Sequence, residues 1–369
     1  MKQQEAQPDY LLLVYFGVLV VFGLIILSFA SVAISVERFN DPNFFLKRQV
    51  LFGFLPGLLA FYVCSKFHYT LFKRYAVLFF AVCVILLLLV FVPGLGASFD
   101  TGAYSWLRIG SYSFQPSEIL KLGLIIFAAS ILSERGKDLA HFRQGFLPIF
   151  AIFSLPIALV VLQPDIGTAL ILFGVVFGLL FVAKARLSHL GLLFLTGVLG
   201  FVIMISVAPY RAARVSTFLH PELDPQGIGY HINQAFLAIG SGGWFGLGLG
   251  RSRQKFAYLP EVHADSIFAV MSEEMGFVVS SLTVLFLVFI ALRMFNIAKR
   301  APSEFARLSV AGIAIWFMIQ SFLNIGAIVG LLPLTGVPLP FISHGGTALM
   351  VGMAAMGMVI NISKYAQSG

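Results

Sequence analysis

The chain has 369 residues, of which 59% are hydrophobic and only 11% are charged, and its formal net charge is +8. Soluble domains carry about 25% charged residues, so this composition excludes a water-soluble globule. Several apolar runs reach about 18 residues or more, the length at which a helix crosses a lipid bilayer. We therefore predict an all-α, polytopic integral membrane protein.

Sequence patterning excludes other classes of protein. The continuous apolar run from Leu78 to Val92 lacks the alternating polarity of a strand in an outer-membrane barrel. Cys64 and Cys83 lie within apolar runs, which predicts neither a disulfide framework nor a cysteine zinc site. The lysines and arginines are scattered in short loops and form no stripe, so no nucleic-acid partner is expected.

About ten apolar segments are predicted as membrane spans. In chain order they are residues 11–35, 50–65, 75–92, 117–132, 145–162, 166–183, 189–207, 266–292, 308–331 and 343–362. The second and fourth are short, and the fourth also carries Glu118 and Lys121. We treat residues 1–369 as one membrane domain.

The loops between these spans set the orientation. Lysine and arginine concentrate in alternate short loops, which places both termini in the cytoplasm. The long segment 208–265, between spans seven and eight, is then extracytoplasmic, and its aromatic residues and glycine-rich run predict a partly folded loop that turns back toward the membrane. Segment 332–342 has three prolines and no charge, which predicts an irregular backbone lining a cavity.

Asp265 is the first candidate for chemistry, because it lies where the long outer loop meets an apolar helix. Partial desolvation there raises the pKa of a carboxyl group and makes it a better proton acceptor at neutral pH. The alternative is that Asp265 is the N-cap of the following helix. His263 is either a second proton carrier or an ordinary loop histidine, and its spacing from Glu261 and Asp265 does not match a zinc site.

Three more ionisable residues fall at outer helix ends. Glu118 and Lys121 are three residues apart on one predicted helix and can pair, and ionisable groups within a span usually face an aqueous cavity. Asp165 lies between two apolar runs. A helix start with a snorkelling lysine and a helix cap are the alternatives. One polar cavity shared with Asp265 explains all of them together.

Arginines supply candidate phosphate ligands. Arg211 and Arg214 open the long loop at helical spacing, and Arg108 follows a tryptophan in another outer loop. Guanidinium groups bind phosphate oxygens bidentately, although anchoring at the membrane interface is a common alternative. The run 240–250 contains six glycines, whose backbone N–H groups are a weaker candidate for phosphate binding.

Four further polar residues lie within predicted spans. Glu273 and Glu274 are adjacent on one helix and point in different directions, so we expect at most one of them to face the cavity. Gln320 and Asn324 lie one turn apart, and we expect hydrogen bonds across helices.

Together these stretches resemble a known family. They read WLRIG (106–110), FQPSEILK (114–121), QPDIGT (163–168), DPQGIGY (224–230), GSGG (240–243), LPEVHADSIFA (259–269), EEMG (273–276) and GVPLPFISHGGT (336–347). In this order they are similar to the SEDS family (shape, elongation, division and sporulation). Residues 248–260 are more similar to the division member FtsW than to the elongation member RodA, whereas His344 departs from the tyrosine that is usual in the family.

The resemblance implies a ten-span peptidoglycan glycosyltransferase that polymerises lipid II on the outer face of the bacterial inner membrane. It also implies a class B penicillin-binding protein and other divisome membrane proteins as partners, and a septal location if the chain is FtsW-like. By motif match, Asp265 is the essential acid, and Glu118, Lys121 and Asp165 line its cavity. Arg108, Arg211, Arg214, His263 and Ser343 complete the candidate substrate-binding set.

The expected reaction joins two lipid-linked sugars. Asp265 is the predicted general base, while Lys121, Arg211, Arg214 or a divalent cation (magnesium or manganese) offsets the charge on the pyrophosphate leaving group. Three alternatives stay open. They are a lipid II flippase, a scaffold without chemistry of its own, and the elongation member of the same family.

Overall fold

The computed structural model describes residues 7–97, 104–110, 112–207, 209–220, 224, 227–256 and 258–366. The helices are α1 (Tyr10–Ala30), α2 (Val32–Phe39), α3 (Phe44–Gln49), α4 (Leu55–Lys66), α5 (Thr70–Arg74), α6 (Ala76–Leu89), α7 (Pro116–Arg135), α8 (Leu147–Leu162), α9 (Ile166–Val182), α10 (Leu187–Val207), α11 (Pro209–Leu219), α12 (Ile228–Ser241), α13 (Ile267–Lys299), α14 (Glu304–Ile328) and α15 (Gly346–Ser363). Short helical turns cover Val50–Phe54, Gly136–Ala140 and Phe142–Phe146. Strands β1 (Gly96–Ala97), β2 (Trp106–Ile109) and β3 (Tyr112–Phe114) form one antiparallel sheet in that order.

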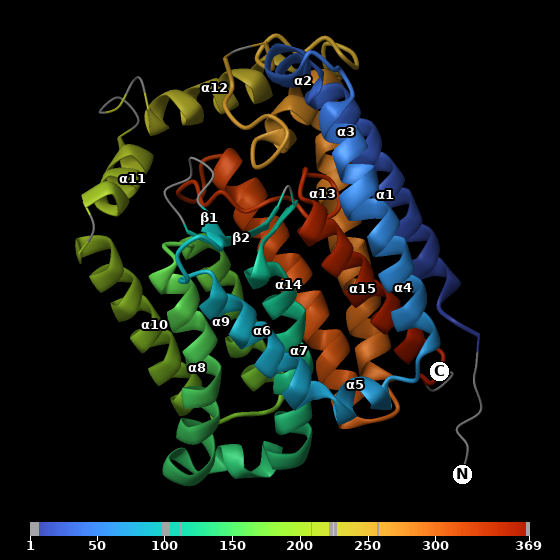
Figure 1. Cartoon of the computed structure of the whole chain (residues 1–369), viewed down its shortest axis with the longest axis vertical. Coiled ribbons are helices and arrows are strands. Elements are labelled where there is room, and N and C mark those ends of the chain that lie inside the picture. Colours follow the sequence, from blue (N-terminus) through green and yellow to red (C-terminus); the bar gives the residue numbers. More distant parts are fainter. Residues whose placement is uncertain are drawn as a thin grey trace.

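The helices that match the expected spans run along one bundle (Figure 1). Within the described residues, eight helices are long and apolar enough to cross a membrane, and α6 and α9 are two shorter apolar helices. The predicted all-α polytopic class is thus confirmed. The bundle is layered, because 78% of the apolar window of α7 is buried in the protein but only 11% of that of α10. Helices α7, α14 and α15 form the interior, and α10 presents its side chains outward.

The first two spans differ from the prediction at their ends. Helix α1 ends at Ala30 and α2 follows, whereas the second span begins at Phe44 and continues through a π-turn to Lys66. The predicted second span began at residue 50 and so left out Lys47 and Arg48. In the structure Lys47 pairs with Asp41 at 2.7 Å, and the Arg48 guanidinium lies over the ring of Phe44. Both charges are therefore accommodated in the first turns of the helix.

Helix α13 is broken where the glycine-rich run packs against it. Gly276 has φ 75° and ψ −179°, and a Cβ on this residue would lie 2.3 Å from the Gly246 nitrogen. The amides of Leu247 and Gly248 donate to the carbonyls of Glu273 and Glu274. These two N–H groups form hydrogen bonds within the protein. The prediction that the run presents its amides to a phosphate is therefore wrong for them.

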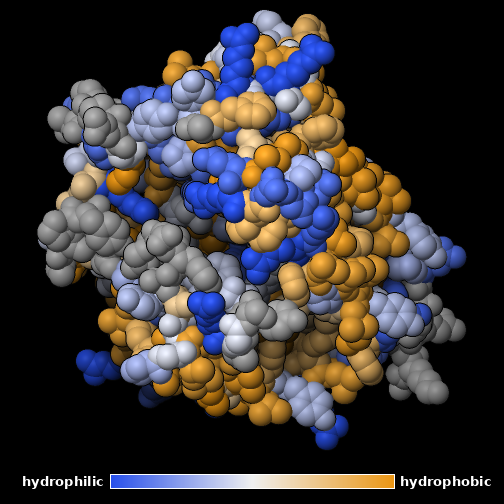
Figure 2. All heavy atoms as spheres, turned by 45° about the horizontal axis from the view of Figure 1, so that its top comes forward, coloured by the Kyte–Doolittle hydropathy of each residue, from blue (hydrophilic) through white to orange (hydrophobic). Residues whose placement is uncertain are grey.

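One end of the bundle carries the irregular and polar elements. As predicted, the long segment is partly folded, since it contains α11 and α12, and residues 332–342 form an irregular backbone. Hydrophilic residues gather on this face, and hydrophobic residues cover the flank below it (Figure 2). At the other end the Asp9 N–H donates to the Ser363 hydroxyl, and the Asp9 carboxylate pairs with Arg293. The start of α1 and the end of α15 thus lie together.

Candidate functional site

The irregular segment 335–344 is fastened to the residues that precede α13. The Ser343 hydroxyl donates to the Ala264 carbonyl at 2.6 Å and accepts the Leu339 N–H at 2.8 Å. The His344 N–H donates to the His263 carbonyl at 2.8 Å. Ser343, a candidate for substrate binding, is buried and uses its hydroxyl in these contacts.

Asp265 lies at this junction, one residue before the N-cap of α13, which is Ser266. The alternative prediction that Asp265 itself caps the helix is therefore wrong. Its backbone carbonyl accepts from Asn324 Nδ2 at 2.9 Å, and its Oδ1 atom is buried with no hydrogen-bond partner. Burial raises the pKa of this carboxyl to about 6, whereas hydrogen bonds from its own N–H and from Ser266, together with the nearby charge of Arg214, oppose the increase. A carboxylate of this pKa stays mostly ionised at pH 7 and accepts a proton readily.

Three histidines surround the junction, and burial lowers the pKa of each. The pKa falls to about 3 for His263 and to about 4 for His231 and His344. All three are neutral at pH 7, so none of them compensates the charge of a carboxylate. The His231 Nε2 atom lies 2.6 Å from the Ser266 hydroxyl, and the ring of His263 lies 4.0 Å from that of Phe45.

Glu118 and Lys121 form a buried ion pair in α7. Lys121 Nζ lies 2.7 Å from Glu118 Oε1, and both side chains are shielded from solvent. The predicted pairing is confirmed, and the snorkelling alternative is wrong. Lys121 also donates to Gln320 Oε1 at 2.9 Å, and Gln320 Nε2 donates to the Pro338 carbonyl at 2.9 Å. The predicted role of Gln320 in cross-helix hydrogen bonding is confirmed as well.

Asp165 is the N-cap of α9. Its Oδ1 accepts the Thr168 N–H at 3.0 Å, and its Oδ2 accepts from Gln115 Nε2 at 3.0 Å. Two residues later, a Cβ on Gly167 would lie 2.5 Å from Val337 Cγ2 and 2.7 Å from the Thr335 carbonyl oxygen. The turn that Asp165 caps therefore packs directly against segment 335–344.

The four ionisable candidates are thus all connected to segment 335–344, although they do not all contact one another. Glu118 and Lys121 reach it through Gln320, Asp265 is joined to it through Asn324, and the turn of Asp165 packs on it. Two pockets adjoin the segment. One is a small cavity of about 30 Å³ between α14, α15 and residues 338–343, and its walls are mostly apolar. Asp265, Asn324 and residues 334–337 surround the second pocket, which is closely packed and has no room for a water molecule.

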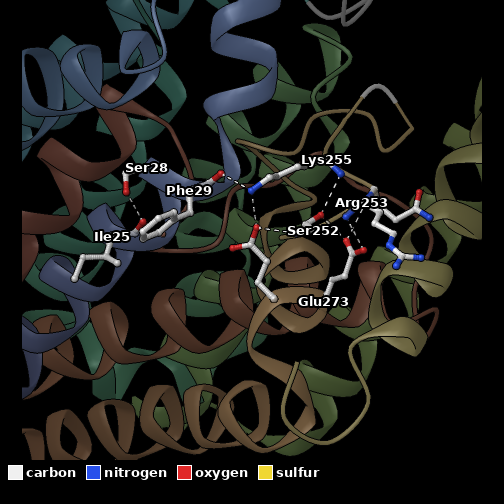
Figure 3. A network of polar contacts seen from close by, with 9 residues as sticks. Ile25, Ser28, Phe29, Ser252, Arg253, Lys255 and Glu273 are labelled. Atoms are coloured by element: carbon white, nitrogen blue, oxygen red, sulfur yellow. Dashed lines mark hydrogen bonds and ion pairs between the residues drawn. The ribbon is translucent and has the colours of Figure 1, made fainter. Parts of the chain in front are cut away.

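A second buried acidic pair is structural. Glu273 accepts hydrogen bonds from the Ser252 hydroxyl and the Arg253 N–H, while Glu274 pairs with Lys255 at 2.7 Å (Figure 3). The expectation that at most one of these carboxylates faces the cavity holds, since both of them bind the turn 252–255.

The family model of cell cycle proteins named FtsW, RodA and SpoVE matches residues 9–368. The chain belongs to this family. Stage V sporulation protein E of Bacillus subtilis (strain 168) is 40% identical over 367 residues, which cover 100% of both chains. A probable peptidoglycan glycosyltransferase FtsW of Geobacter sp. (strain M18) is 37% identical over 356 residues, 96% of each chain. The expected family membership is confirmed.

Solved structures of this family share the fold. One match is a chain from a structure described as the structural coordination of polymerization and crosslinking by a peptidoglycan synthase complex. It has a TM-score of 0.79 and 28% identity, over 96% of this chain and 97% of that chain. The rod shape determining protein RodA of Thermus thermophilus has a TM-score of 0.71 and 27% identity, over 98% of each chain.

In this member of the FtsW, RodA and SpoVE family, the arginines that were predicted to bind phosphate lie in different surroundings. Arg214, on α11, acts electrostatically on Asp265, whereas Arg108 is exposed in β2 and donates to the Gly110 carbonyl. The side chain of Arg211 lies outside the described residues. Sequence reasoning missed Arg38 and Arg48, which act electrostatically on His263 and His344 respectively. Both arginines lie far from Asp265 in the sequence, so no local sequence pattern linked them to it.

The donor set does not fit a metal site built from acidic, histidine or cysteine ligands. In the part of the chain that the structure describes, no three His, Cys, Asp or Glu side chains come close enough to hold an ion. Asp265 interacts electrostatically with one further carboxyl, Glu261, whose pKa is raised by its own burial and by the charge of Asp265.

Proposed function

We propose that this chain is a peptidoglycan glycosyltransferase that polymerises lipid II, with Asp265 as its general base. Membership of the FtsW, RodA and SpoVE family supports the activity. The observation that carries the assignment of Asp265 is its buried Oδ1, which has no partner within the protein and belongs to a carboxyl whose pKa is about 6. By contrast, both carboxylate oxygens of Asp165 accept hydrogen bonds from the chain.

In the proposed reaction the hydroxyl oxygen of the acceptor sugar attacks the anomeric carbon of the donor. The bond between that carbon and the pyrophosphate oxygen breaks, and the polyprenyl pyrophosphate leaves with the electron pair. Asp265 takes the proton of the attacking hydroxyl and later releases it to water. A base near pKa 6 is close to the operating pH, which is where proton transfer is most efficient.

Arginine, rather than Lys121, supplies the positive charge that offsets the negative charge of the leaving group. Lys121 is already neutralised by Glu118, and both are sealed in the bundle. Arg214, Arg38 and Arg48 lie near the Asp265 junction, as their electrostatic effects on Asp265 and its histidine neighbours indicate. Guanidinium groups suit the oxygens of a pyrophosphate. The Glu118–Lys121 pair then serves to position segment 335–344.

The proposal extends to place and partners. We assign the protein to the bacterial inner membrane with both termini cytoplasmic and the long segment 208–265 outside, so that sugars stay in water and prenyl chains in lipid. The concentration of lysine and arginine in alternate short loops supports this orientation. A class B penicillin-binding protein is the proposed partner, with other divisome proteins and a septal location if the chain acts in division.

The test is polymerisation of lipid II by the purified protein, with and without a class B penicillin-binding protein, followed by gel separation of glycan chains. Glycan chains from the native protein, and none from Asp265→Asn, are expected. A protein that moves lipid II between leaflets of a vesicle without forming glycan would be a transporter. One that does neither while still binding its partner would be a scaffold.

A further inference from the structure

The break in α13 divides this helix into two parts, which are joined through another segment of the chain. In an unbroken helix, the N–H groups of residues 277 and 278 donate to the carbonyls of residues 273 and 274. Here those N–H groups donate to the carbonyls of residues 243 and 244, and the carbonyls of residues 273 and 274 accept from residues 247 and 248. The glycine-rich run therefore controls the placement of the first part, residues 267–275.

The same end of residues 267–275 is fixed by a group of polar side chains, which we call the clasp (Figure 3). The clasp consists of Ser252, Lys255, Glu273 and Glu274. Glu273 accepts from the Ser252 hydroxyl, and Glu274 pairs with Lys255 at 2.7 Å. Each of the four residues is at most 4% exposed. Charged side chains are almost never buried so completely unless they are paired, so the clasp ties the turn 252–255 to the end of this short helix.

Lys255 also reaches the N-terminal part of the chain. Its Nζ donates to the Phe29 carbonyl at 3.2 Å, in the last turn of α1 (Figure 3). Helix α1 leads into α2, which carries Arg38, and the charge of Arg38 acts on Glu261 near the proposed base. One lysine thus bonds both to the short helix that follows Asp265 and to the helix that leads to Arg38.

We propose that the clasp positions Asp265 and Arg38 relative to one another, so that the general base and the charge that offsets the leaving group are correctly spaced. This inference rests on the proposed function, which gives those roles to Asp265 and Arg38. A misplacement of about 1 Å can cost about 100-fold in rate. The four clasp residues are positioning residues, and their loss lowers kcat more than it changes KM, because alignment acts mainly on the transition state.

The test separates positioning from stability. Lys255→Met removes the bond to Phe29 and leaves the Glu274 carboxylate buried without its partner, which lowers the melting temperature. Glu274→Gln/Lys255→Met removes both charges, so the melting temperature recovers while the link to Phe29 stays absent. Asp9→Asn/Arg293→Met is the matched control. It removes an ion pair that joins the same two helices, α1 and α13, at the other end of the bundle, and asparagine still caps α1.

The measurements are the kinetics of lipid II polymerisation by the purified protein with a class B penicillin-binding protein, and thermal unfolding in detergent. We expect Glu274→Gln/Lys255→Met to melt as the native protein does, with kcat reduced about tenfold or more and KM nearly unchanged. The control should keep native kcat and KM. Ser252→Ala removes one hydroxyl of the clasp and leaves both charges paired, so it should fold normally and show a smaller loss of kcat.

A second readout needs no turnover. Spin labels are attached to cysteines at Glu37 in α2 and at Tyr258 in the loop between the clasp and Asp265, since both positions are exposed. The two native cysteines, Cys64 and Cys83, are replaced by alanine. Pulsed electron resonance then measures the distance between the labels. Its distribution should be narrow in the native background, broader in Glu274→Gln/Lys255→Met, and narrow in the control.

Native kcat in Glu274→Gln/Lys255→Met overturns the proposal, because activity would then follow stability alone. An unchanged distance distribution overturns it too, as does an equal loss of kcat in the control. If the double variant does not fold, Ser252→Ala decides, and native kcat in that variant rejects the clasp. Failure of the proposed function looks different, since the native protein would form no glycan from lipid II while the label distance would still broaden on loss of the clasp.

Discussion

Lys121 Nζ lies 2.7 Å from Glu118 Oε1 within the bundle, and neither side chain reaches solvent. Loss of one partner from such a pair leaves an uncompensated buried charge, which costs about 3–5 kcal/mol. The pair also controls Gln320, whose amide holds the Pro338 carbonyl. Its integrity therefore bears on both stability and the shape of segment 335–344.

We expect Lys121→Ala to lose more glycan synthesis than Lys121→Arg, and to unfold at a lower temperature than the double variant Glu118→Gln/Lys121→Met. The double variant removes both charges, so no unpaired ion stays buried. Thermal unfolding in detergent and lipid II polymerisation measure the two effects. Equal activity of Lys121→Ala and Lys121→Arg would show that positive charge is not needed at this position.

The sequence predicted the features that depend on local residue spacing and on the thickness of the bilayer. Apolar run length gave the spans, because a helix needs a fixed length to cross the hydrocarbon core. The three-residue spacing of Glu118 and Lys121 gave their pairing. The contact from Asn324 to Asp265, 59 residues apart, depends on tertiary packing that no local pattern encodes. The break of α13 at Gly276 was missed for the same reason, since the glycine run that fills it comes from another segment.

Asp265→Asn is expected to reduce lipid II polymerisation by about 10²- to 10⁴-fold, because an amide cannot take the proton of the acceptor hydroxyl. The side chain keeps its size, and its backbone carbonyl still accepts from Asn324, so expression and membrane insertion should be normal. Glycan formation by the purified variant and its partner is the measurement. Near-native synthesis would remove Asp265 from the reaction.

The pH profile should follow the same carboxyl. Since its pKa is raised to about 6, the basic form is lost as pH falls through 6, and activity should drop about tenfold per unit below that value. Glu261→Gln is the control, because Glu261 also has a raised pKa and interacts with Asp265. This variant should keep the acidic limb, with its midpoint slightly lower. Disappearance of the limb would assign it to Glu261.

Stability should respond to pH in the opposite sense. The folded state holds the Asp265 proton more tightly than the unfolded chain, in which the pKa is near 3.8, so the folded state loses stability as pH rises from about 4 to 6. Asp265→Asn removes this loss, which amounts to at most about 3 kcal/mol. The variant should melt at a higher temperature than the native protein at pH 8, but at the same temperature at pH 4. Identical melting at both values would contradict the burial of this charge.

Gly167→Ala tests whether the turn after Asp165 supports the site. The added Cβ would meet Val337 Cγ2 at 2.5 Å and the Thr335 carbonyl at 2.7 Å, so segment 335–344 must shift. Because Asn324 ties that segment to the backbone of Asp265, we expect polymerisation to fall about tenfold or more, as misplacement of reacting groups does. Gly200→Ala in α10 is the matched control, since a Cβ there meets no atom within 4 Å. If both alanine variants polymerise lipid II equally well, the packing of α9 against segment 335–344 has no part in positioning Asp265.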